Sequence, residues 1–101
     1  MRYDKLVRDK IPSLIREGGE TPIIRVLDDE EYCLQLEKKL DEEVIEFHKD
    51  RNIEELADIL EVILALNESL GKTKEDLISV YQQKHEARGG FSDRIFLIDK
   101  E

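Results

Sequence analysis

The sequence predicts an all-α protein, a bundle of about four helices with at most a small β-ribbon. Apolar residues recur at helical spacing from Asp28 onward, and the two prolines and five glycines fall where helical segments begin or end. A chain of 101 residues is expected to form one small domain over residues 1–101. Because a domain of this size buries only about 60 to 65% of its unfolded surface, a second subunit is a natural source of further burial.

Residues 10–17 are expected to form a short first helix. Asp9 can cap it, Pro12 takes an early position that needs no N–H donor, and a pair of glycines ends it. Residues 22–27 then combine a proline with β-branched side chains, which favours an extended conformation. They could pair with the similar run at residues 94–98 and form the two-stranded ribbon. The alternative is that both segments are extended and lie across the helices.

Three longer helices follow from the apolar pattern. The first begins at Asp28 and is interrupted at residues 50–52. The second covers residues 53–70 and is apolar nearly all round, which is typical of a central helix. The third begins near Thr73 and stops at the glycines of residues 89–90. The buried stripe of the first helix lies within roughly 60 degrees on a helical wheel and consists of Cys33, Leu36, Leu40, Val44 and Phe47.

Composition narrows the classes of function. The chain has 25 acidic and 16 basic side chains and a formal net charge of −9. Such an acidic excess repels nucleic acids and anionic membranes, so neither is expected as a partner, and metal cations are the more natural counterions. No apolar stretch approaches the roughly 20 residues that span a bilayer, and Cys33 is a lone cysteine. We therefore expect a soluble protein of a reducing compartment, the cytoplasm.

Two pairs of carboxylates are candidate metal ligands. Glu55 and Asp58 share a face of the central helix that continues as apolar, and two negative charges in such surroundings are costly without a cation. Glu43 and Glu46 lie three residues apart on the preceding helix, beside its buried stripe. Two antiparallel helices joined by a short loop can face these pairs toward each other. Oxygen-only ligands favour magnesium, manganese or calcium over zinc. The alternative is that each pair is a solvated acidic face.

The last helix carries cationic residues on its inward stripe. Lys84, His85 and Arg88 continue the face that holds Leu77 and Tyr81, so they are expected to point toward the same interior as the carboxylates. Phosphoryl-transfer sites neutralise a polyphosphate between metal-holding carboxylates and Lys or Arg side chains. The alternative is that these cationic side chains pair with the acidic helices. A second basic cluster precedes the first helix and consists of Lys5, Arg8 and Lys10.

The acidic residues resemble a known metal signature. Glu42-Glu43-x-x-Glu46 followed by Glu55-Leu56-Ala57-Asp58 is similar to the motif of the MazG-like all-α nucleotide pyrophosphohydrolases. The flanking strings resemble those of a small single-domain branch described as phosphoribosyl-ATP pyrophosphohydrolase-like. They are Lys5-Leu6-Val7-Arg8-Asp9-Lys10-Ile11-Pro12 and Lys84-x-x-x-Arg88-Gly89-Gly90-Phe91-x-x-Arg94-Ile95. The likeness covers nearly the whole chain.

The resemblance implies Mg²⁺-dependent cleavage of a nucleoside triphosphate between its α and β phosphates, with Mn²⁺ as a substitute cation, and a homodimer or dimer of dimers. Glu43, Glu46, Glu55 and Asp58 would hold the metal, with Glu46 as the general base. The expected phosphate contacts are Lys84 and Arg88, with Arg94, Lys5, Arg8 and Lys10 as helpers. The alternative is a non-catalytic acidic helical dimer that acts as an adaptor, or a nucleotide-binding regulator.

Overall fold

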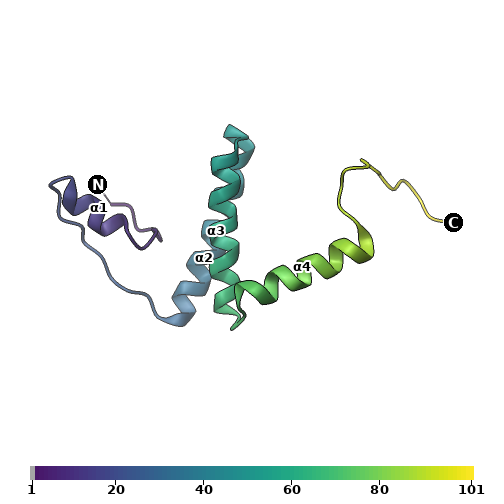
Figure 1. Ribbon diagram of the computed structural model, residues 1–101. Helices are drawn as coiled ribbons and strands as arrows, with labels where there is room; N and C mark the ends of the chain where they lie inside the picture. Colours follow the sequence, from purple (N-terminus) through teal and green to yellow (C-terminus); the bar gives the residue numbers. More distant parts are fainter. Residues whose placement is uncertain (1) are drawn as a thin grey trace.

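The computed structural model describes residues 2–101, and within them it contains four helices and no strand. The helices are α1 (Ile11–Glu17), α2 (Asp29–Asp50), α3 (Ile53–Ser69) and α4 (Lys74–Arg88), arranged as in Figure 1. The predicted all-α class and the count of about four helices are therefore confirmed.

Side-chain caps explain where the three long helices begin. Asp28 precedes α2 and Asn52 precedes α3, and each accepts a hydrogen bond from the backbone N–H three residues later, at 2.9 and 3.0 Å. Thr73 and Asp76 at the start of α4 bond reciprocally, each side chain accepting the other residue's backbone N–H. These caps satisfy donors that the first helical turn leaves without partners, so they fix the helix starts.

The start of α1 differs from the prediction. Lys10, and not Asp9, is the N-cap residue, and no side chain caps this helix. The physical reason is that Lys10 already has helical backbone angles and the N–H of Ile11 donates to the carbonyl of Arg8 at 3.0 Å. A turn at residues 9–10 therefore leads directly into α1. Pro12 lies in the first helical turn, as expected.

Helices α2 and α3 form an antiparallel hairpin joined by a two-residue connection. Arg51 ends α2 in the left-handed region at φ 48°, and Asn52 then starts α3. Leu36 on α2 and Val62 on α3 are the buried hydrophobic residues in the described part of the chain. The carboxylates of the predicted site lie on this hairpin. Their relative positions are therefore set by the packing of the α2 face that carries Leu36 and the α3 face that carries Val62.

The remaining helices extend away from the hairpin. Figure 1 shows α4 leaving at the end of α3 that is remote from residues 51–52, and α1 on the other side. Among the described residues, α4 packs against α3 alone and α1 packs against no other helix. The molecule measures 61 × 32 × 23 Å and exposes 9651 Å². A compact protein of this mass exposes about 6000 Å², so about 3700 Å² more surface is exposed than a closed monomer would show.

The predicted β-ribbon does not form within residues 2–101. Residues 22–27 and 94–98 lie outside helices and strands, and Figure 1 shows them on opposite sides of the α2–α3 hairpin. Their separation by the hairpin explains why the two segments do not pair. The alternative, that they pack across the helices, is not seen either, because most of their large apolar side chains are exposed.

No helix in the part of the chain that the structure describes is long and apolar enough to cross a membrane.

Candidate metal centre

Two overlapping groups of carboxylates lie at the connected end of the hairpin. In one group, single oxygen atoms of Glu43, Glu55 and Asp58 all lie within 4.8 Å of one another. In the other, single oxygen atoms of Glu46, Asp50 and Glu55 meet the same limit. Glu55 belongs to both groups. The structure therefore brings together the four predicted ligands and adds Asp50 as a fifth acid.

Helical spacing and the short connection explain this arrangement. Glu43, Glu46 and Asp50 follow one another at intervals of three and four on α2, so they share one side of the helix. The Asn52 cap starts α3 three residues before Glu55, which places that carboxylate in the first turn, opposite them. Asp50 was not predicted as a ligand because it lies where α2 ends. Its spacing of four from Glu46 is the signal that identifies it.

The environment of Glu55 favours a cation. Loss of hydration raises the pKa of Glu55, and repulsion by the neighbouring Asp58, Asp50, Glu43 and Glu46 raises it further. All of these neighbours are carboxylates, the oxygen donors that hard divalent cations prefer. A divalent cation would relieve both effects, so the donor set fits Mg²⁺ or Mn²⁺.

Arg8 reaches the candidate metal centre from the segment before α1. Its Nη2 lies 2.7 Å from Oδ1 of Asp58, and its Nη1 lies 3.5 Å from Oε1 of Glu61. Arg8 was predicted as a helper in substrate binding, and the structure places it beside a predicted metal ligand. All three side chains retain substantial solvent exposure, so the pair with Asp58 is open to exchange with another partner.

Lys39 is a second cation at the candidate metal centre, and it was not predicted. Its Nζ lies 3.4 Å from Oε1 of Glu43 and 3.4 Å from Oε1 of Glu42. The side chains of Lys39 and Glu43 are only 20% and 12% exposed, so this pair is less screened by water than that of Arg8. The spacing of four residues on α2 was the available signal.

The other predicted phosphate contacts lie elsewhere in this chain. Lys84 and Arg88 are on α4, which does not pack against α2, and Arg94 follows α4. Lys10 is the N-cap residue of α1, and Nζ of Lys5 lies 5.8 Å from the centre of the Tyr3 ring. Within residues 2–101 of a single copy, the α4 cations and the carboxylates are therefore not brought to one interior. The physical reason is the outward course of α4.

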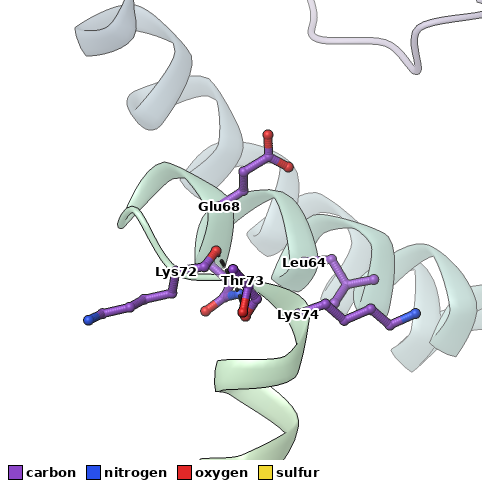
Figure 2. Close-up of a pocket in the computed structure, with 6 residues that line it drawn as sticks. Leu64, Glu68, Lys72, Thr73 and Lys74 are labelled. Carbon is purple, nitrogen blue, oxygen red and sulfur yellow. Dashed lines mark hydrogen bonds between the residues drawn. The ribbon is translucent and has the colours of Figure 1, made fainter.

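A hollow at the α3–α4 turn lies at the opposite end of α3 from the carboxylates. Figure 2 shows it, with the side chains of Lys72 and Lys74 pointing away from it in different directions. Asn67 closes the turn by donating from Nδ2 to the carbonyl of Thr73 at 2.8 Å. These contacts hold the junction between α3 and α4 together. The candidate functional site is therefore the group of carboxylates at the other end of the hairpin.

Comparisons with known proteins give one short match. A curated protein of Mycolicibacterium smegmatis (strain ATCC 700084 / mc(2)155), described as uncharacterized, is 62% identical over 42 residues. The match covers 42% of this chain and 43% of that relative, so the chain spans less than half of the relative's length. No family model matches the chain, and no solved structure matches it. A proposal about function therefore depends on the carboxylates.

Proposed function

We propose that this protein is a Mg²⁺-dependent nucleoside triphosphate pyrophosphohydrolase of the MazG-like type, which releases a nucleoside monophosphate and pyrophosphate. One observation carries the proposal: five carboxylates from two antiparallel helices meet in two groups whose oxygen atoms lie within 4.8 Å. The acidic motif that resembles the superfamily supplies four of these five residues. Carboxylates gathered on partly buried faces repel one another and lose hydration, and a bound cation would offset both costs.

Glu43, Glu55 and Asp58 would hold one cation, and Glu46 and Asp50 extend the donor set beside Glu55. Mg²⁺ or Mn²⁺ bound there supplies charge neutralisation for the phosphates and lowers the pKa of a water molecule. Within this set we assign Glu46 the role of general base, which accepts the proton of the water that attacks the α phosphorus. The bond between the α phosphorus and the oxygen that bridges to the β phosphate then breaks, and pyrophosphate leaves.

The cations of the chain would bind the phosphates. Arg8 already lies at Asp58 and is the best-placed group to exchange its carboxylate partner for a phosphate. Lys84 and Arg88 are remote in a single copy, so the proposal assigns their contact with the β and γ phosphates to a second copy of the chain. This assignment agrees with the surplus exposed surface, which favours a homodimer or a dimer of dimers. The cytoplasm is the proposed compartment, because a lone cysteine such as Cys33 stays reduced there.

A second candidate function has specific support. The pairs Arg8–Asp58 and Lys39–Glu43 neutralise two of the carboxylates without a metal. For an acidic helical dimer that acts as an adaptor or as a nucleotide-binding regulator, this neutralisation by Arg8 and Lys39 would be sufficient. This alternative predicts that Mg²⁺ does not change thermal stability, or that nucleotides bind without turnover.

The test is product analysis with a panel of nucleoside triphosphates, with Mg²⁺, with Mn²⁺ and with chelator. Wild type should release a nucleoside monophosphate and pyrophosphate only with the metals, and Asp58→Asn should lose at least about 100-fold in turnover. The matched control is Glu54→Gln, one residue from Glu55 but exposed and outside both carboxylate groups. Absence of turnover by wild type with every nucleotide and both metals would favour the adaptor.

A further inference from the structure

Two segments outside the helices expose apolar side chains to an unusual degree. In residues 22–27, Ile23 is 99% and Val26 is 93% exposed. In residues 94–98, Phe96 is 87% and Leu97 is 77% exposed. Successive residues of an extended chain point to opposite sides, so both sides of each segment are apolar. Such a pattern is typical of strands that are covered on both faces.

The backbone of these segments is also without partners. In the chain from residue 2 onward, no backbone N–H of residues 23–27 or 95–98 donates to another backbone group. Unpaired extended backbone with apolar side chains is the usual template for strand pairing between chains.

The geometry of one copy prevents the two segments from meeting. Arg25 donates from Nη2 to Oε2 of Glu31 at 2.8 Å, which holds the first segment near the start of α2. The second segment follows α4 and lies on the opposite side of the hairpin, as Figure 1 shows. The two segments are nevertheless similar in length and apolar character, so each can be the strand partner that the other does not have within its own copy.

We propose that residues 94–98 of one copy pair as a β-ribbon with residues 22–27 of a second copy, and reciprocally. A two-fold arrangement forms this contact twice and leaves neither segment unpaired. The surface supports a second copy as the occupant: the chain exposes about 3700 Å² beyond a compact monomer of its mass. The two copies together carry a surplus of about 7400 Å². Stable homodimers bury about 2000 to 5000 Å² in total over both partners, so the surplus is large enough for an intertwined dimer.

Cross-linking between two differently tagged chains tests this pairing. In a Cys33→Ser background, one chain carries Ile24→Cys and the other carries Phe96→Cys, at the centres of the two segments. After co-refolding, a short bismaleimide should join the two tags in most of the mixed dimers. The control pair is Lys72→Cys with Phe96→Cys, since Lys72 is exposed in the α3–α4 turn and outside both segments. That pair should cross-link at least about 10-fold less.

Two results would overturn the proposal. One is no tag-to-tag product from the mixed chains above the Lys72 control. The other is efficient cross-linking within a single chain that carries both cysteines, which would show that the segments pair in one copy. Neither readout depends on turnover, so failure here leaves the proposed hydrolase standing, and absence of turnover leaves this interface standing.

Removal of residues 94–101 gives a second measurement. The shortened chain should keep its helical circular dichroism, because α1 to α4 end before this segment. Its dimer dissociation constant should rise at least about 100-fold in light scattering or sedimentation, since four large apolar side chains leave the interface. A helical shortened chain that dimerises as tightly as wild type would contradict the proposal.

Discussion

Glu55 is the residue on which the candidate metal centre depends, because both carboxylate groups include it. Burial and four neighbouring carboxylates raise its pKa, which means that its charged form is disfavoured in the metal-free protein. We expect Glu55→Gln to melt at a higher temperature than wild type without metal. The same change should abolish the rise in melting temperature that Mg²⁺ produces.

The measurement is a thermal-shift titration with Mg²⁺ and Mn²⁺. At about 100 times the dissociation constant, a bound cation stabilises wild type by about 2.7 kcal/mol. Glu54→Gln is the control and should respond to metal as wild type does. An equal metal response in wild type and Glu55→Gln would show that these carboxylates do not hold the cation.

Arg8 is expected to compete with the cation for Asp58, since it lies 2.7 Å from that carboxylate. Arg8→Ala should therefore bind Mn²⁺ a few times more tightly, while the loss of an exposed ion pair costs no more than about 1 kcal/mol of stability. Turnover should nevertheless fall by about 10-fold or more, because a phosphate contact is lost. Calorimetry and steady-state kinetics measure the two effects.

Arg2→Ala is the matched control for Arg8→Ala, because Arg2 lies in the same segment and pairs with Asp4, which belongs to neither carboxylate group. It should leave Mn²⁺ affinity and turnover unchanged. If Arg8→Ala weakened Mn²⁺ binding, Arg8 would stabilise the candidate metal centre and would not compete with the cation for Asp58.

The sequence allowed the grouping of Glu43, Glu46, Glu55 and Asp58 to be predicted, and the reason is local. Pairs three residues apart on each of two adjacent helices must share a face, and a short connection brings the faces together. The Lys39–Glu43 pair could have been predicted from the same spacing. The Arg8–Asp58 pair could not, since it joins residues fifty apart and depends on where the segment before α1 lies.

At the level of elements, the start of α4 depends on its capping box. Hydrogen bonds from the backbone N–H of Thr73 and then from its hydroxyl lower the pKa of Asp76 below its ordinary value of 3.8. Because the folded pKa is the lower one, Asp76 stabilises the protein fully above about pH 3.8. That contribution is lost as the pH falls through the lowered pKa.

Asp76→Asn should therefore reduce the stability of α4 at neutral pH, and the difference from wild type should shrink as the pH falls below 3.8. Thermal melts followed by circular dichroism across this pH range measure the difference. Glu75→Gln, in the same turn but outside the capping box, is the control. A difference that stayed constant down to the lowest pH would show that the charge of Asp76 has no part in the cap.

Helix bounds could be predicted wherever a cap and an apolar stripe agreed, as at Asp28 and Thr73. The predicted cap of α1 was wrong. Asp9 was chosen because its residue type favours capping, but the turn at residues 9–10 leads directly into the helix and leaves Lys10 as the N-cap residue. Pairing of residues 22–27 with 94–98 could not be settled from their similarity, because pairing depends on the course of the elements between them.

For the whole molecule, the decisive feature is that α4 carries Lys84 and Arg88 away from the carboxylates of its own chain. If a second copy supplies them, two inactive variants should restore each other. Arg88→Ala and Asp58→Asn should each lose at least about 100-fold in turnover. An equal co-refolded mixture should recover about a quarter of wild-type activity, because half of the dimers are mixed and each retains one intact site.

Coupled pyrophosphate release measures this recovery. Mixing each variant with itself provides the baseline. No recovery above the baseline, in mixtures shown to contain mixed dimers, would place Arg88 outside the site of the other copy. The sequence could not reveal the outward course of α4, since an apolar stripe does not tell in which direction the helix leaves α3.

Hydrolysis in water enriched in heavy oxygen shows which phosphorus the water attacks. With Mg²⁺, the heavy oxygen should appear in the nucleoside monophosphate and not in the pyrophosphate, because water attacks the α phosphorus while Glu46 accepts its proton. Mass spectrometry of the two products for wild type and Glu46→Gln gives the answer. Heavy oxygen in pyrophosphate or free phosphate, or equal turnover by wild type and Glu46→Gln, would contradict the account.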